Sequence, residues 1–492
     1  MSSPPGSPAP PSPGPTGPSG SDFDVPRWLL VALALLVGVA AVVSVIEVRK
    51  LLGGDEAAGP EHPDTWDARV LPLVERVEKL RGLEFEQPVY VDFLPVKEFR
   101  KKVTADEKDL DDEAREEIEQ GTAFMRAVGV LEGDLDLLDS INDLHSGGTL
   151  GYYAFEDERI TIRGTRLTWA IRSTLVHELT HALQDQHFDI GTRSKRLEDD
   201  EDDNPSAMAF ESLVEGDARR IEQKWSESLN RKQRKALRAS EKAQTDKAES
   251  DLEDVPEFLT TLIGASYALG EALMASAGTS NARVDKLFRL PPTTEEHLLD
   301  PFTLLLDEEG QAGVDKPAVK DGEKEVDSST FGAVGWYLVL AERIPVKEAL
   351  RAVDGWGGDS YVHVERKGRQ CVRVGYVADT KRDLGEMYTA LKAWVAATPR
   401  TASVSRSGDQ LTFESCDPGR KARVGRQQSE EALQLALNRT WLTVQIREDV
   451  NAKVARCLAG GLVQDFSSAE LQVEQLDAEQ QQRVAAIRGR CL

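Results

Sequence analysis

A long apolar run lies near the N-terminus of the chain. From residue 28 to residue 46 every residue is apolar except Gly38 and Ser44. As a helix this run is roughly 28 Å long at 1.5 Å per residue, which is enough to cross the hydrocarbon core of a bilayer. We therefore predict a transmembrane helix over residues 27–48. Residues 1–26 are dominated by Pro, Ser and Gly, so we predict that they form a disordered tail.

The remainder of the chain mixes helical and strand-like periodicities. A hairpin is predicted over 151–162, where two β-rich arms flank a charged turn, and an amphipathic helix over 167–188. The mixture predicts an α+β, mainly helical domain over residues 62–420, followed by a polar, helical C-terminal segment over 429–492. Further helices are predicted at 65–83, 105–119, 219–252 (densely charged and exposed), 258–274 and 381–396, and strands at 88–93, 361–364, 371–377 and 411–414.

The helix predicted over 167–188 contains the motif His-Glu-Leu-Thr-His at residues 177–181. Residues four apart lie on the same face of a helix, so His177 and His181 can bind one metal ion. Glu178 leans toward the open coordination position, where it can act as a general base on the attacking water. An apolar stripe would bury the back of this helix, which argues against two histidines spaced by chance on a surface helix. The stripe consists of Leu175, Val176, Leu179, Ala182 and Leu183.

A catalytic zinc ion also needs a third protein ligand, which should lie on another helix. Residues 207–218 supply two carboxylates, Glu211 and Glu215, one helical turn apart, so both can point at the same place. Apolar neighbours in this segment argue against a helix face whose carboxylates are merely solvated. The spacing alone leaves both residues open as the ligand.

Four segments of the chain together resemble the gluzincin-type (HExxH…EGxA) zinc metallopeptidases of bacterial envelope-associated proteins. The resemblance covers roughly residues 65–420, and its first two segments carry the assignment as an enzyme. The chemistry of the other two segments does not follow from their residues. The four segments are residues 177–188, Glu215-Gly216-Asp217-Ala218, Pro291-Pro292-Thr293-Thr294-Glu295-Glu296 and Gly355-Trp356-Gly357-Gly358-Asp359.

This resemblance implies a zincin-like domain that binds Zn²⁺ and hydrolyses peptide bonds. It implies a zinc ion held by His177, His181 and Glu215. Glu178 would be the catalytic base and later the proton donor to the leaving amine. In this family the glycine that corresponds to Gly216 lets the helices approach.

The resemblance also assigns the carboxylates around Glu215. Glu211 or Asp217 would orient a ligand histidine from behind. In the alternative assignment Glu211 is the ligand and Glu215 lies behind it.

A group that stabilises the transition state is not assigned by these motifs. After the third segment the family commonly places a His before a Pro, whereas this chain has Asp300-Pro301 with His297 nearby. No such role is therefore carried over to a His there. Tyr152 or Tyr153 could stabilise an oxyanion, although tyrosines in strands are more often core residues.

The charge of the chain restricts its partners. It has 60 basic and 85 acidic residues and a formal net charge of −25. Such a protein repels a phosphate backbone, which argues against nucleic acid as a partner. The expected partners are a protein or peptide substrate and the membrane, and the sequence does not indicate an oligomeric state.

Four cysteines, all beyond residue 370, indicate the compartment of the domain. An even number without a Cys-x-x-Cys pair fits two disulfides and an oxidising environment. Cys371 and Cys416 fall in two predicted strands, so a bridge between neighbouring strands is expected. Cys457 and Cys491 bracket a predicted helical hairpin, which the second bridge would close.

The cysteines also orient the anchor. Its flanking basic residues, Arg27 on one side and Arg49 and Lys50 on the other, slightly favour a cytoplasmic C-terminal side, but by a single charge. A cleaved signal peptide is disfavoured because no basic cluster precedes the apolar run and no small-x-small site follows it. We predict a single-pass cell-membrane protein whose C-terminal domain is extracytoplasmic.

These expectations combine into a membrane-anchored zinc metallopeptidase that hydrolyses peptide bonds. One alternative is a non-catalytic envelope binding or assembly protein that keeps zinc for structure. The presence of Glu178 argues against it, because a structural site has no need of a base. A second alternative is a hydrolase of cell-wall amides, which the ligands do not distinguish from a peptidase.

Overall fold

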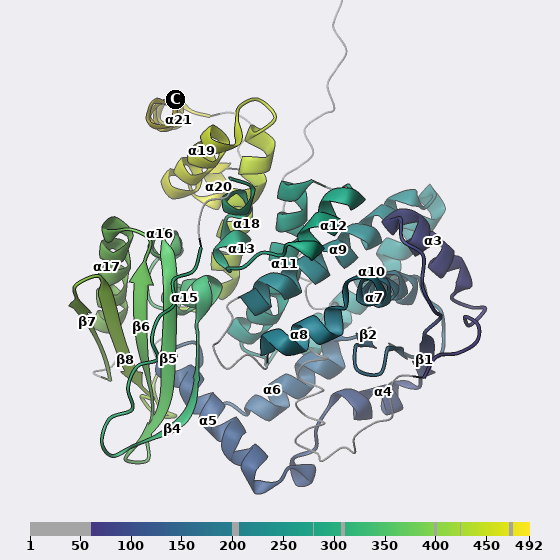
Figure 1. Ribbon diagram of the computed structural model, residues 1–492, viewed down its shortest axis with the longest axis horizontal. Coiled ribbons are helices and arrows are strands. Elements are labelled where there is room, and N and C mark those ends of the chain that lie inside the picture. The colour runs from purple at the N-terminus through teal and green to yellow at the C-terminus, as the bar shows by residue number, and fades with distance from the viewer. Residues whose placement is uncertain are drawn as a thin grey trace, which may run out of the picture.

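The computed structural model describes residues 61–198, 206–278, 280–306, 310–397, 401–423, 425–471 and 476–492. The predicted disordered tail and transmembrane helix lie outside these residues. The described chain is mixed α+β and mainly helical, as predicted. Figure 1 shows a sheet half, residues 310–423, built on a five-stranded sheet, and a helical half, residues 61–306, which contains a three-stranded sheet; the C-terminal helices lie against both.

The helical half opens with short helices and a small sheet. Its elements are α3 (Leu71–Arg81), β1 (Tyr90–Leu94), α4 (Val96–Val103), a 3₁₀ turn (Glu107–Asp109), α5 (Asp112–Val128), α6 (Leu137–Asp143), a π-helical turn (Leu144–Gly148), β2 (Gly151–Ala154) and β3 (Arg159–Arg163). The strand order is β1–β3–β2, with β1 parallel to β3, and β2 and β3 form the predicted hairpin. α3 is shorter than predicted, because it has Pro72 in its first turn and ends at Gly82, which is left-handed. The acidic helix begins only at Asp112, because the side chain of Asp111 caps it.

Longer helices then build the core of this half. They are α7 (Trp169–Phe188), α8 (Ile190–Glu198), α9 (Ser206–Ser228), α10 (Arg231–Asp251), α11 (Glu257–Ala277) and α12 (Asn281–Arg289), followed by the short α13 (Glu296–Leu299) and α14 (Pro301–Leu306). α7 agrees with its prediction and is capped by Thr168. The segment 219–252 is not one exposed helix, contrary to the prediction. Its first residues complete α9 and bury Trp225, and only α10 is largely exposed.

α11 is long and apolar enough to cross a membrane, the one such helix in the part of the chain that the structure describes. However, 67% of its apolar window is buried inside the protein. It packs against α9 and against α18 (Ser429–Ile446). α11 is therefore a core helix, in agreement with the helix predicted at 258–274.

One face of the five-stranded sheet is covered by helices. The elements of the sheet half are β4 (Glu323–Ser329), α15 (Gly332–Ala341), α16 (Val346–Val353), β5 (Trp356–Arg366), β6 (Gln370–Ala378), α17 (Lys381–Ala397), β7 (Ala402–Ser407) and β8 (Gln410–Cys416). Neighbouring strands are antiparallel, in the order β4–β5–β6–β8–β7. Phe413 packs against Trp336 of α15 and Trp394 of α17. The covered face is thus the apolar one.

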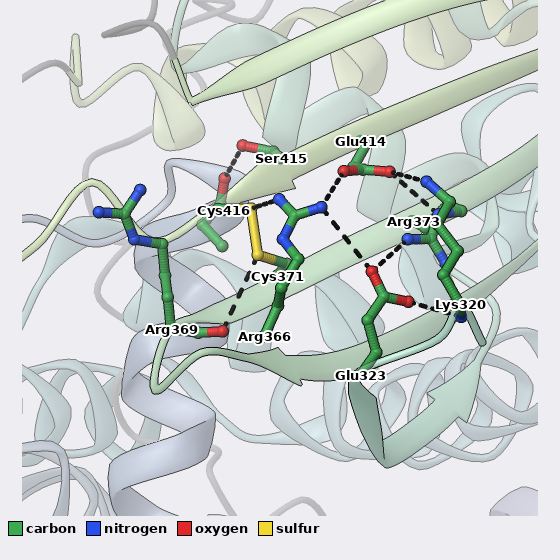
Figure 2. The surroundings of a disulfide bond; sticks show 10 residues. Lys320, Glu323, Arg366, Arg369, Cys371, Arg373, Glu414, Ser415 and Cys416 are labelled. Atoms are coloured by element: carbon green, nitrogen blue, oxygen red, sulfur yellow. Dashed lines mark hydrogen bonds and ion pairs between the residues drawn. A yellow bond between two sulfur atoms is a disulfide. The ribbon is translucent and has the colours of Figure 1, made fainter.

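The opposite face carries a disulfide and an ion-pair network, which Figure 2 shows. Cys371 and Cys416 lie directly opposite each other on β6 and β8 and form the predicted bridge. Beside it, Glu414 accepts hydrogen bonds from Lys320, Arg366 and Arg373. Burial would raise the pKa of Glu414, but these hydrogen bonds outweigh it and lower the pKa to about 2.

The C-terminal segment is helical, as predicted. It contains α18, α19 (Ala452–Asp465), α20 (Ser468–Leu471) and α21 (Ala478–Cys491). The predicted disulfide between Cys457 and Cys491 joins α19 to α21. Because α18 packs on α11, α15 and α16, this segment contacts both halves of the protein (Figure 1).

Two of the segments that carry the family resemblance meet at the N-terminus of α15. Glu295, just before α13, accepts a hydrogen bond of 2.8 Å from the backbone N–H of Val334. Asp359 on β5 accepts one of 2.7 Å from the backbone N–H of Phe331, and others from two indole rings. Both carboxylates are buried at the positive end of the helix dipole. The structure thus gives the segment of Glu295 a role in joining the two halves, and it gives the segment of Asp359 a role in holding α15 on β5.

Candidate metal centre

The His-Glu-Leu-Thr-His motif lies in the middle of α7. The rings of His177 and His181 are neighbours, with their centroids 4.6 Å apart. Both histidines and Glu178 are at most 2% exposed. The apolar back of α7 packs into a core shared with α3 and the small sheet, as the sequence pattern indicates. α7 therefore holds the motif in a closed, polar centre.

α9 supplies Glu215, and a close contact between two helices sets its position. A Cβ atom on Gly216 would lie 2.4 Å from the carbonyl oxygen of Gly270 on α11. A Cβ atom on Gly270 would lie 2.1 Å from the carbonyl oxygen of Ser212. Only glycine fits at these two positions, so the backbones of α9 and α11 touch there. The close approach is thus made with α11, which also places the ring of Tyr267 against His177, with their centroids 6.2 Å apart.

The structure brings together His177, His181 and Glu215. Nε2 of His177 lies 3.1 Å from one carboxylate oxygen of Glu215, and Nε2 of His181 lies 3.5 Å from the other. Their candidate ligand atoms all lie within 4.8 Å of one another, and this is the one such group found among the described residues. Glu211 is half-buried and is not part of the group.

Gln184 fixes the protonation pattern of His181. Its amide nitrogen donates to the carbonyl oxygen of Val214 and to Asp217, so its oxygen faces Nδ1 of His181 at 3.0 Å. Nδ1 must then carry the proton, which leaves Nε2 with a lone pair. This Nε2 and the Glu215 oxygen that it faces have no hydrogen-bond partner. A cation between them would satisfy both atoms.

Glu222 lies behind His177. Its Oε2 is 3.7 Å from Nδ1 of His177, and its Oε1 accepts a hydrogen bond of 2.6 Å from the hydroxyl of Ser173. Burial opposes the charged imidazolium, but the neighbouring carboxylates of Glu215 and Glu222 outweigh it and raise the pKa of His177 to about 10. This side of the centre therefore attracts positive charge, either a proton or a metal ion.

These residues fit a divalent metal ion. Two imidazoles and one carboxylate make up a donor set typical of catalytic metal sites with an open position. Arg219 pairs with Glu222, but the buried carboxylates of Glu178 and Glu215 have only the two histidines beside them, so a bound cation would offset their charge. The hydrogen bond between Nδ1 of His181 and Gln184 holds that ring in place. A buried group of two His and one Glu thus stands ready to hold a metal ion.

Glu178 lies beside this group without being one of its ligands. The backbone N–H of Tyr153 on β2 donates to its carboxylate, while its Oε2 has no hydrogen-bond partner. Burial raises the pKa of Glu178, against the opposing influence of His177 and His181. A carboxylate with one unbonded oxygen in such a centre is suited to accept and release a proton.

A further layer of charge lies behind Gln184. Asp217 accepts hydrogen bonds from Arg81, Arg220 and Gln184. Asp217 therefore acts on His181 only through Gln184, whereas the sequence suggested that Asp217 or Glu211 would orient a histidine directly. Sequence reasoning missed Gln184, three residues after His181. It also missed Glu222, which lies behind His177 and follows Glu215 by two helical turns. For both residues the available signal was their helical spacing from a ligand.

The other candidates from the sequence have separate roles. The hydroxyl of the buried Tyr153 donates to Asp185 at 3.0 Å, and Tyr152 packs in a small core beside the sheet. Both are therefore core residues, as is usual for tyrosines in strands. His297 is buried, and its hydrogen bond is with Thr303.

No family model, curated protein or solved structure matches this chain. The function must therefore be inferred from the geometry of the centre and from the sequence motifs.

Proposed function

We propose that the protein is a membrane-anchored zinc metallopeptidase that hydrolyses peptide bonds. One observation carries the proposal: a buried His-His-Glu group lies beside Glu178, a carboxylate that is not a ligand and keeps one oxygen without a hydrogen-bond partner. A site that holds a metal ion only for structure has no need of such a base.

The chemistry follows from the positions of these side chains. His177, His181 and Glu215 would hold the zinc ion, which when bound supplies a Lewis acid that activates water and polarises a carbonyl group. Glu178 accepts the proton of the attacking water and later donates it to the departing amine. Its raised pKa suits both tasks, because a less acidic carboxylate holds the proton more firmly between the two steps.

The outer edge of β2 is the proposed binding edge for an extended peptide. β2 pairs with β3 on one side only, and its Tyr153 donates a backbone N–H to Glu178. An extended chain that adds to a sheet edge is held by main-chain hydrogen bonds, whatever its side chains. A peptide bound there would pass close to Glu178.

The location of the enzyme forms part of the proposal. A transmembrane helix over residues 27–48 would anchor it in the cell membrane, with the domain outside the cytoplasm. Both disulfides support this placement, because such bonds persist in oxidising compartments. The proposed partners are the membrane and protein or peptide substrates.

Two other functions would use the same ligands. In an envelope binding or assembly protein the metal ion would be structural, and the unbonded oxygen of Glu178 speaks against that role. A hydrolase of cell-wall amides would share the whole centre. The edge strand beside Glu178 favours a substrate with an extended peptide backbone.

The substitution Glu178→Gln tests the proposal. It keeps the size of the side chain and all three ligands but removes the base. Hydrolysis of unfolded proteins should therefore fall by about a hundred- to ten-thousand-fold. Zinc content, measured by plasma mass spectrometry, and the melting temperature should stay near those of the wild type.

Two further variants control for the metal. Glu215→Ala should lose zinc, whereas Glu211→Ala should retain it; the reverse result would exchange the two roles. Equal cleavage rates for wild type and Glu178→Gln would show that hydrolysis comes from elsewhere and would favour the binding protein. Cleavage of cell-wall amides but of no protein would favour the amide hydrolase.

A further inference from the structure

The N-terminal half of α10 presents basic side chains on an otherwise acidic protein. Residues 231–238 contain five Lys or Arg and no acidic residue, whereas the whole chain has 85 acidic and 60 basic residues. Four of the five recur at spacings of three and four, which places them on one helix face. These four exposed residues, which we call the basic stripe, are Arg231, Arg234, Lys235 and Arg238.

The basic stripe keeps its charge available. Within the described residues, no carboxylate forms an ion pair with any of its four side chains. Farther along α10 the pattern differs, since Lys242 pairs with Asp246 at 2.7 Å. Glu241, the next acidic residue along the chain, is partly buried and lies near Ser173; among the four residues of the stripe it attracts Arg238. The stripe is therefore a positive surface that is open to an external anion.

The basic stripe shares a core with the first described residues of the chain. Leu237, on the buried face of α10, belongs to the same buried cluster as Val70 and Leu73. Only the twelve residues 49–60 separate the predicted anchor from the described chain. Fully extended, they span at most about 40 Å. The anchor would thus hold this face of the domain near the bilayer.

We propose that the basic stripe docks the domain onto a membrane surface rich in anionic phospholipids. Clusters of Lys and Arg close to a membrane are attracted to lipid phosphates, and each residue adds to the attraction. Guanidinium groups can also form paired hydrogen bonds with phosphate oxygens. The short connection to the anchor keeps the local concentration of lipid high, so a stripe of four charges suffices. The inference rests on the proposed anchor and not on peptidase activity.

The test uses the full chain in lipid nanodiscs, either of phosphatidylcholine alone or of an equal mixture with phosphatidylglycerol. Hydrogen–deuterium exchange of the α10 amides reports docking. Exchange should slow by about tenfold or more in the anionic discs relative to the neutral ones. Because the attraction is electrostatic, the difference should disappear at about 1 M salt.

Two variants that each lose four positive charges show whether the protection depends on the basic stripe or only on the net charge of the protein. The first variant carries Arg231→Gln, Arg234→Gln, Lys235→Gln and Arg238→Gln. It should lose the protection, and its melting temperature shows whether it is folded. The second, on exposed lysines of the sheet half, should keep the protection; it carries Lys316→Gln, Lys324→Gln, Lys367→Gln and Lys381→Gln.

The remaining outcomes are decisive as well. Equal exchange in neutral and anionic discs would overturn the proposal. Protection by soluble polyphosphate, but not by anionic discs, would assign the stripe to a soluble polyanion instead. Glu178→Gln should be protected like the wild type, so a failure of the peptidase proposal would leave this result unchanged.

Discussion

At the scale of single residues, the candidate centre depends on the groups behind the histidines as much as on the histidines. Gln184 holds Nδ1 of His181, and its own amide is held by Asp217. Glu222 lies behind His177 at 3.7 Å, held by Ser173 and Arg219. Rings held from behind lose little freedom when they bind a metal ion, and their second nitrogen is already aimed at it.

Replacing Gln184 with Leu tests this role. Leu has a similar volume but accepts no hydrogen bond from Nδ1 of His181, so the ring is no longer fixed. Affinity for zinc, measured by competition with a chromogenic chelator, should fall about 10- to 100-fold. Gln186→Leu is the matched control on the same helix, because Gln186 donates to the carbonyl oxygen of Gln87 and not to a ligand. Unchanged affinity in Gln184→Leu would contradict the role.

Single residues also show how far the sequence predicts such a centre. His177, Glu178 and His181 could be predicted because their types and spacing are characteristic of metal chemistry. Gln184 was missed although it lies one helical turn from His181, because an amide has no characteristic metal role and its partner Asp217 is 33 residues away in the chain. Contacts of that kind depend on how α7 and α9 pack, which periodicity does not reveal.

At the scale of elements, the crossing of α9 and α11 places Glu215. The helices themselves could be predicted, because their apolar periodicity is strong. The glycine contact between them could not be located, since Gly270 lies in a helix with no motif. Strands β4 and β7 were missed for another reason. They are polar edge strands without the alternation that marks a half-buried strand.

The substitution Gly216→Ala should disturb this crossing. The new Cβ atom would overlap the carbonyl oxygen of Gly270, so the helices must separate and the neighbouring Glu215 must shift. The free energy of unfolding should fall by about 1–3 kcal/mol, as for other overpacked cores, and zinc should bind more weakly. Denaturant unfolding and metal analysis measure the two effects.

Gly385→Ala in α17 is the control for this substitution, because a Cβ atom at Gly385 would meet no atom within 4 Å. It should leave zinc binding unchanged and stabilise the protein slightly, since Ala favours a helix more than Gly. Normal stability and zinc content in Gly216→Ala would show that the crossing tolerates separation.

At the scale of the whole molecule, two buried carboxylates meet at the N-terminus of α15, and one of them, Glu295, joins the two halves. Glu295 reaches α15 from the helical half, and Asp359 reaches it from β5. The sequence marked both segments as unusual, but it could not show that they meet, because they are far apart in the chain and neither has a periodic pattern. The association of the halves is a long-range property that only the folded chain reveals.

The stability of the protein should consequently depend on pH. Burial raises the pKa of Glu295 to about 8 and that of Asp359 to about 6, whereas the unfolded chain has ordinary values. The folded protein therefore keeps protons that the unfolded chain releases. The contribution of these protons to the stability of the folded protein is fully present below about pH 4 and is lost as the pH rises to about 8.

Glu295→Gln should reduce that dependence, because the amide is neutral at every pH. Between about pH 5 and pH 8, the free energy of unfolding of the wild type in urea should fall by an amount on the order of a few kcal/mol. The free energy of unfolding of the variant should fall by less. Glu98→Gln, at an exposed position, should behave like the wild type. A wild type that is equally stable at both pH values would rule out the buried protons.

The edges of the sheets bear on how copies of the protein would behave if the proposed anchor crowded them together on a membrane. The edge strand β4 carries Glu323, Lys324 and Glu325, and β7 at the other edge is polar and exposed. Edges of this kind resist the addition of a strand from another copy, which is a common route to aggregation. β2 has an edge without a charged residue, and it is the edge beside Glu178. Strand addition is thus discouraged at both edges of the five-stranded sheet, whereas the proposed function requires it at β2.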